Sequence, residues 1–132
     1  MPGEMNLEKL LDTMSPVLLA GEYVFCSFPQ AQYGDWAELE PIACVVEGEG
    51  LTLVIPRSLA DASHLSYEAI FRAITLTVHS SLDAVGLTAA FSAKLAEHNI
   101  SANVIAGYFH DHIFVQADVA EQAHKALNEL CG

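Results

Sequence analysis

Hydrophobic residues recur at the helical period in three segments of this chain. Leu7, Leu10, Leu11 and Met14 lie on one helical stripe, with Asn6 as an N-cap and Pro16 as a stop. Leu87, Phe91 and Leu95 form a second stripe, in a helix expected over residues 87–98 and ended by Asn99 in a left-handed cap. A third helix is expected over 119–130, with Asp118 as its N-cap; its stripe is Val119, Ala123, Ala126, Leu127 and Leu130.

Runs rich in β-branched and aromatic residues predict strands between these helices. Residues 42–47 and 51–55 are joined by Gly48, Glu49 and Gly50, which predicts a tight hairpin. Ser58 is expected to cap a short helical turn over 58–64. Further strands are expected at 22–28, 71–79, 103–108 and 112–116.

The order strand, helix, strand, strand, helix in the second half predicts a ferredoxin-like α/β sandwich, an α+β fold with helices on one face of an antiparallel sheet. With 132 residues, the chain matches one ordinary domain or two half-size modules. The two halves show no clean internal repeat.

Composition and charge exclude several partners. Hydrophobic residues make up 52% of the chain, but no apolar run reaches the roughly 18 to 20 residues of a membrane span. Five Lys and Arg against seventeen Asp and Glu give a net charge of −12, which disfavours nucleic acid. The acidic first twelve residues do not resemble a secretion signal, so a cytoplasmic location is expected.

The cysteines and aromatic residues are expected to be structural. Three cysteines without a Cys-x-x-Cys pair argue against a disulfide framework or a zinc knuckle. Cys26 and Cys44 are interpreted as small buried side chains. The core is expected to include Tyr23, Phe25, Phe28, Phe71, Phe91, Phe109 and Phe114.

The junction over residues 80–87 is the strongest candidate for a functional site. A polar turn there leads from a strand into the helix that starts near Gly86, and first-turn N–H groups attract carboxylate or phosphate. Residues 80–86 contain no Lys or Arg, so an anionic ligand must rely on N–H groups and hydroxyls. The alternative is an ordinary helix start capped by Ser81 or Asp83.

This junction also carries a family resemblance. Residues 83–87 (DAVGL), followed by 95–100 (LAEHNI), resemble the ACT-domain signature Asp-x-Pro-Gly-Leu and Leu-Ala-x-x-Gly-Ile, with Val85 for the proline and Asn99 for the glycine. ACT domains are small regulatory modules that bind amino acids. The whole chain is similar to small bacterial tandem ACT-domain proteins of uncharacterised role. The resemblance implies an N-terminal module at residues 1–68 and a C-terminal module at 69–132.

The resemblance also implies a ligand site. In that family the ligand lies between the first strand–helix loop of one module and the second strand of a neighbour, in an intermodule or intersubunit groove. Asp83 is then the natural partner of the ligand's ammonium. The implied ligand-binding residues are Ser81, Leu82, Asp83, Val85, Gly86 and Leu87 on one side and Asn103, Val104 and Ile105 on the other.

His110 and His112 form the one metal-like pair of the sequence. Their i, i+2 spacing suits one face of a strand, but a third ligand is missing, so a structural turn with Asp111 at its tip is favoured. No nucleophilic triad or phosphate-binding loop is present.

The sequence therefore predicts a non-enzymatic regulatory protein that binds a small molecule, with an amino acid as the expected ligand and no cofactor. The alternatives are an interaction or assembly module without ligand and, third, an enzyme using His110 and His112. A homo-oligomer, in the simplest case a dimer, is expected because ferredoxin-like sheets leave edge strands. A sensor of this kind also needs a protein target, which the sequence does not name.

Overall fold

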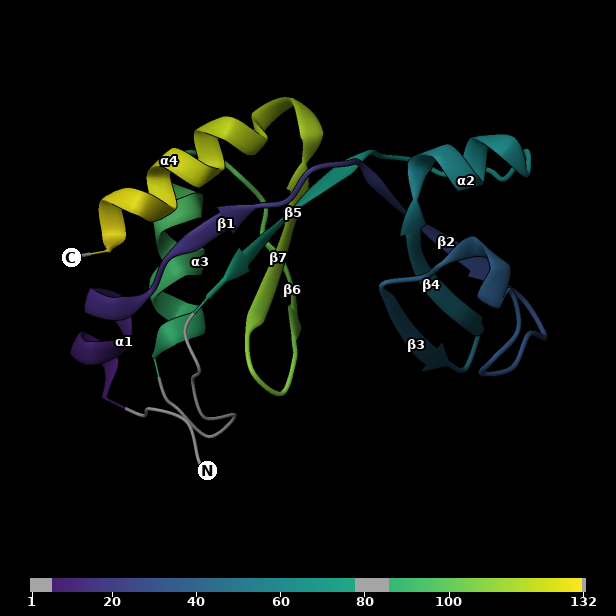
Figure 1. Ribbon diagram of the computed structural model, residues 1–132, viewed down its shortest axis with the longest axis horizontal. Coiled ribbons are helices and arrows are strands. Elements are labelled where there is room, and N and C mark those ends of the chain that lie inside the picture. Colours follow the sequence, from purple (N-terminus) through teal and green to yellow (C-terminus); the bar gives the residue numbers. More distant parts are fainter. Residues whose placement is uncertain (1–5, 78–85, 132) are drawn as a thin grey trace. The chain divides into compact units, whose positions relative to one another are not determined.

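The computed structural model describes residues 6–77 and 86–131, which form two compact units. The larger unit combines residues 6–20 with the described residues from 72 onward, and the smaller unit is residues 21–71. Figure 1 labels the elements of both. The α-helices are α1 (Leu7–Thr13), α2 (Arg57–Ala62), α3 (Leu87–Glu97) and α4 (Ala120–Leu130), and the 3₁₀ turns are η1 (Ala37–Leu39) and η2 (Ala117–Val119).

The strands of the described residues pair in antiparallel registers. β1 pairs with β5, β6 with β7, and β2 and β3 each pair with β4. Their bounds are β1 (Pro16–Leu18), β2 (Tyr23–Phe28), β3 (Ala43–Glu47), β4 (Gly50–Pro56), β5 (Phe71–Leu76), β6 (Asn103–Ala106) and β7 (Asp111–Gln116).

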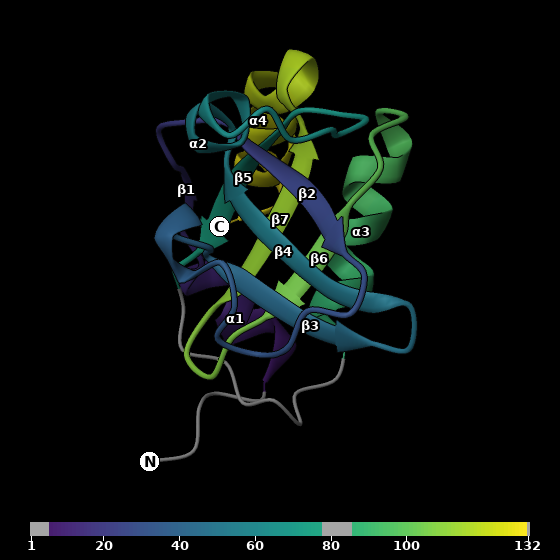
Figure 2. The same cartoon turned by 90° about the vertical axis from the view of Figure 1, so that its right-hand side faces the viewer.

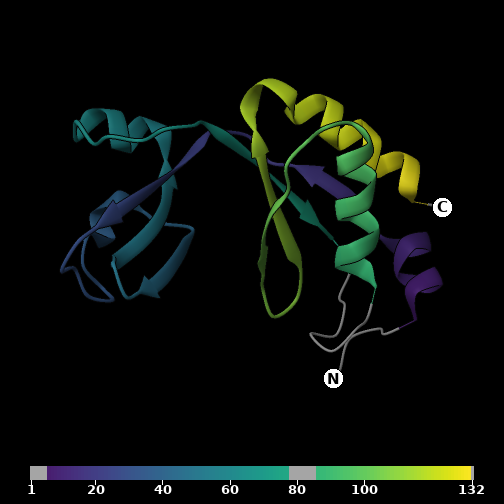
Figure 3. The same cartoon turned by 180° about the vertical axis from the view of Figure 1, so that it is seen from behind.

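The larger unit has the strand order β1-β5-β7-β6, with α3 and α4 packed against each other on one face (Figure 3). This is the predicted ferredoxin-like arrangement, with β1 beside β5 in the place of the fourth strand. Leu10 and Met14 from the N-terminal segment share one buried core with Phe91 and Leu95 of α3 and Leu127 of α4. Residues far apart in sequence therefore build this core.

The smaller unit repeats the theme around β3, β4 and β2, with α2 above them in Figure 2. Glu47 pairs with Gly50, so the predicted hairpin closes through Gly48 and Glu49. Phe71, the first residue of β5, pairs with Tyr23 and supplies the start of a fourth strand. The core of this unit contains Val24, Cys26, Phe28, Leu39, Leu51, Leu53, Ile55 and Ala60.

Three predicted local features are wrong. Ser58 does not cap α2, whose N-cap is Pro56, and Asp118 lies in η2 rather than at the N-cap of α4. Asp111 is not at a turn tip, because it begins β7 and pairs with Ala106. In each case the helix or strand starts one or two residues away from the expected position. The polar side chain therefore does not occupy the cap or turn position that was predicted for it.

Two predicted core residues are exposed. Cys44 lies on β3, and the residues that follow it there, Val45, Val46 and Glu47, are also exposed. Phe109 is 58% exposed and packs edge to face against Tyr108 in the turn between β6 and β7. A strand at the end of its sheet and a hairpin tip offer too few neighbours to bury these side chains.

The chain passes between the two units after Ala20 and after Phe71. The smaller unit is therefore inserted in sequence between β1 and most of β5. The division into an N-terminal module at residues 1–68 and a C-terminal module at 69–132 stays a prediction.

Candidate functional site

The predicted site centres on the start of α3. Gly86 is the N-cap of this helix and has φ +99°, a backbone conformation that favours glycine. Its carbonyl accepts the first helical hydrogen bond, from the Ala90 N–H at 2.9 Å. A glycine has no side chain with which to cap, and the first N–H groups of a helix have no partner within it. This end of α3 therefore suits a negatively charged or carbonyl acceptor.

Gly86 also has a packing role. A Cβ at this position would lie 3.2 Å from Cδ2 of Leu7 in α1. Leu87 is 3% exposed, and its side chain belongs to the core of the larger unit. Only the backbone of Leu87 can therefore contact a ligand.

The other predicted site residues fall into two groups. Ser81, Leu82, Asp83 and Val85 lie outside the described residues. The second-strand group, Asn103 to Ile105, lies in β6 at the end of the strand order, and its part in a ligand site stays a prediction. The Asn103 side chain donates from Nδ2 to the Phe114 carbonyl at 3.2 Å, so part of its hydrogen-bonding capacity is used within the sheet.

The histidine pair lies beside β5. His112 Nδ1 is 3.0 Å from Oγ1 of Thr75, a buried hydroxyl. Burial lowers the pKa of His112, repulsion from His110 lowers it further, and the Asp111 charge opposes both. Burial raises the pKa of Asp111, against the influence of His112 and His110. Within residues 6–77 and 86–131, no three His, Cys, Asp or Glu side chains are grouped as metal ligands. That His110 and His112 are structural stays a prediction.

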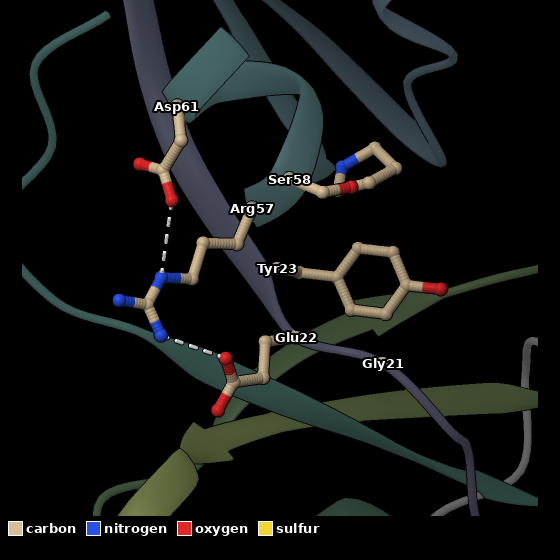
Figure 4. Close-up of a pocket in the computed structure, with 7 residues that line it drawn as sticks. Gly21, Glu22, Tyr23, Arg57, Ser58 and Asp61 are labelled. Atoms are coloured by element: carbon tan, nitrogen blue, oxygen red, sulfur yellow. Dashed lines mark hydrogen bonds and ion pairs between the residues drawn. The ribbon is translucent and has the colours of Figure 1, made fainter.

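A cavity in the smaller unit, with charged side chains at one end, was not predicted from the sequence. It has a volume of about 410 Å³, and Figure 4 shows the charged side chains of Glu22, Arg57 and Asp61 together at one end. Arg57 Nη1 donates to Glu22 Oε1 at 2.8 Å, and Arg57 Nε lies 3.5 Å from Asp61 Oδ2. Only the i, i+4 spacing of Arg57 and Asp61 was visible in sequence, because Glu22 is thirty-five residues away. The cavity is lined by Gly21, Glu22, Tyr23, Pro56, Arg57, Ser58 and Asp61.

Two family models for the ACT domain match almost the entire chain, one at residues 2–72 and one at residues 68–129. The chain belongs to the ACT domain family. This assignment agrees with the ferredoxin-like strand order and the glycine at the start of α3. It supports a regulatory, small-molecule-binding role, and no catalytic family is indicated.

Solved structures of similar proteins agree with the tandem ACT fold. A protein of unknown function from Vibrio cholerae, described as a possible transport protein, is 58% identical, with a TM-score of 0.87 and 96% of each chain covered. The regulatory subunit of aspartate kinase from Thermus flavus is 10% identical, with a TM-score of 0.64, 88% of this chain and 96% of that chain covered. At that identity the likeness shows the fold alone. A search of curated proteins finds no sequence match.

Proposed function

We propose that this tandem ACT protein is a non-enzymatic regulator that binds an amino acid at the start of α3. The observation that supports the proposal is Gly86, an N-cap at φ +99° with no side chain to accept from the first-turn N–H groups of α3, which are groups that bind carboxylates. Asp83, outside the described residues, would hold the ligand's ammonium. Ser81, Leu82 and Val85 would complete the loop side of the site.

The second side of the proposed site is β6. Asn103, Val104 and Ile105 lie on a strand at the end of its sheet, where a neighbouring module or subunit could approach. The Asn103 amide keeps donor and acceptor capacity beyond its bond to Phe114. A groove formed with a neighbour would bury a ligand better than the surface of one module.

We also propose that the chain acts as a homo-oligomer with a separate protein target. β3 ends the strand order of the smaller unit, and its Val46 is 72% exposed. Pairing with a second copy would bury such a strand. Three free thiols, one of them on exposed β3, are typical of a reducing compartment and support a cytoplasmic location. None of the helices in the described ranges is long and apolar enough to cross a membrane.

A thermal-shift screen of the twenty amino acids tests the ligand. A ligand present at 100 times its dissociation constant adds roughly 2.7 kcal/mol to stability, so one or a few amino acids should raise the melting temperature clearly. For an amino acid that does so, Asp83→Ala should weaken binding by calorimetry by about 1 to 3 kcal/mol.

Two results would contradict the proposal. No shift with any amino acid would favour the alternative, an assembly module that lacks a ligand. Unchanged affinity in a folded Asp83→Ala protein would show that Asp83 does not hold the ligand's ammonium. The exposed residue Glu121 on α4 provides the matched control, because Glu121→Ala also removes one carboxylate from the larger unit without touching the proposed site.

A further inference from the structure

Hydrogen bonds orient the half-exposed Arg57 guanidinium at one end of the cavity of the smaller unit. Arg57 is the one Lys or Arg between residues 10 and 71 of the sequence. Its Nη1 bonds to Glu22, its Nε donates to the Tyr67 hydroxyl at 3.2 Å, and that hydroxyl donates to Asp61 Oδ1 at 2.7 Å. The contacts to Glu22, Asp61 and Tyr67 thus occupy Nε and Nη1. These three contacts do not use Nη2, so this nitrogen can donate hydrogen bonds to a ligand.

The cavity has two chemically different ends. Figure 4 shows the side chains of Glu22, Arg57 and Asp61 at one end and the ring of Tyr23 at the other. Pro56 adds further apolar surface to the lining. A ligand that fills the space therefore needs a charged head and an apolar substituent.

The charges at the polar end discriminate among possible head groups. A simple anion would meet two carboxylates for one guanidinium, so repulsion from Glu22 and Asp61 disfavours it. A simple cation would lie beside the like charge of Arg57 and would offer no acceptor to Nη2. A zwitterion can place its carboxylate on Arg57 and its ammonium beside Glu22 and Asp61, and so satisfies both signs.

We propose that this cavity binds a small zwitterion, of the size of an amino acid with an apolar side chain. Arg57 Nη2 holds the carboxylate, the free oxygen of Glu22 holds the ammonium, and the apolar substituent lies against Tyr23 and Pro56. This site is separate from the one at the start of α3, so it goes beyond the proposed function and does not depend on it.

The test uses the ¹⁵N-labelled full chain and each of the twenty L-amino acids. At least one amino acid with an apolar side chain should shift the amide signals of Glu22, Tyr23 and Ser58 saturably. The amine formed by decarboxylating that amino acid, and its N-acetyl derivative, should each bind about tenfold more weakly or worse, because each lacks one charge of the pair. Equal binding of the amine would overturn the proposal in favour of a cation site.

Substitutions of the charged residues test whether the ligand that shifts these amide signals binds at the charged end of the cavity. Arg57→Lys keeps the charge but loses the planar fork, and should weaken binding about tenfold. Glu22→Gln should also weaken binding about tenfold, because it removes the charge that holds the ammonium. This variant replaces Arg57→Lys in the test if Arg57→Lys fails to fold. Glu68→Gln, at an exposed carboxylate of the same unit outside the cavity lining, should bind like the wild type. Wild-type affinity in a folded Arg57→Lys or Glu22→Gln protein would overturn the proposal.

The same spectra separate this proposal from the site at α3. An amino acid that shifts the amides of Glu22 and Ser58, with affinity unchanged by Asp83→Ala, supports the cavity. An amino acid that shifts Gly86 and Leu87 alone supports the proposed function and overturns the cavity proposal. If none of the twenty shifts Glu22, Tyr23 or Ser58, the cavity proposal fails whatever happens at α3.

Discussion

The Leu7 side chain fills the space beside Gly86, since a Cβ at position 86 would lie 3.2 Å from Leu7 Cδ2. The contact joins the N-cap of α3 to α1, a helix about eighty residues earlier in the sequence. Together with φ +99°, it gives Gly86 a structural role in addition to the proposed ligand role. A larger residue such as valine at position 86 would therefore disturb folding as well as any ligand contact.

Gly86→Ala should lower the free energy of unfolding by about 1 to 2 kcal/mol, because a side chain is strained at this positive φ. Urea unfolding measures the change. Gly48→Ala is the matched control, since Gly48 has no positive φ and a Cβ added there would meet nothing within 4 Å. Its stability should stay within about 0.5 kcal/mol of the wild type. Equal stability of the Gly86→Ala protein would show that the backbone relaxes there at little cost.

The sequence predicted the elements whose signals are local. Asn6 caps α1 by accepting from the Lys9 N–H at 3.1 Å, and the Gly48 hairpin closes as expected. Asn99 has φ +57° at the end of α3, the left-handed conformation predicted from its amide side chain. Each of these features depends on residues within four positions of one another, so a short sequence window contains the cause.

The features that the sequence did not predict depend on distant partners. β1 is three residues long and is stabilised by pairing with β5, from Pro16 opposite Leu76 to Leu18 opposite Ile74. The cavity depends on Glu22 and Arg57 meeting across two elements. For the site at α3, the sequence was enough to propose Gly86 and the β6 residues. It does not specify which neighbouring module or subunit would complete a ligand groove there.

Asn99 provides a second stability test. Asn99→Ala should cost about 1 kcal/mol because alanine lacks the local hydrogen bonding that lets Asn adopt the left-handed region, whereas Asn99→Gly should be neutral or slightly stabilising. The control is Asn128→Ala at an exposed position in the last turn of α4, where alanine is the better helix former. Urea unfolding should therefore give opposite signs for the two alanine variants. A loss of stability at Asn128 equal to that at Asn99 would argue against the conformational explanation.

β3 provides a test of assembly. Val46→Lys should shift the protein toward a monomer of 14.2 kDa in sedimentation at micromolar concentration, because a charged side chain on an end strand opposes pairing with a second copy. Tyr33→Lys changes a residue that is 82% exposed and lies outside the strands, so it should leave assembly unchanged. A wild-type monomer under these conditions would contradict the homo-oligomer proposal.

Zinc titration tests the structural interpretation of the histidine pair. Neither calorimetry nor competition with a chromogenic chelator should detect zinc binding at micromolar affinity, since a third ligand is missing beside His110 and His112 among the described residues. If zinc bound at that affinity and the double substitution of His110 and His112 by Ala removed it, the metal interpretation would replace the structural one.

His112 should make stability fall as the pH drops below about 6.5. Burial lowers its pKa below the ordinary value of 6.5, so the unfolded chain takes up a proton at a higher pH than the folded chain. Its contribution to stability is therefore present above pH 6.5 and is lost as the pH falls. Asp111 acts in the opposite sense, because its raised pKa gives a contribution that is lost as the pH rises above 3.8.

His112→Gln removes the titrating group, so the free energy of unfolding should fall less between about pH 7 and pH 5 than in the wild type. His98→Gln, at an exposed histidine after α3, is the control for loss of a histidine alone. Urea unfolding at several pH values gives the slopes, and an NMR titration of the His112 ring should give a pKa below 6.5. Because the Thr75 hydroxyl can donate to or accept from Nδ1, the bond between them is compatible with the neutral ring that this result requires. A ring pKa above 6.5, or identical slopes for wild type and His112→Gln, would mean that burial beside Thr75 does not control the charge of His112.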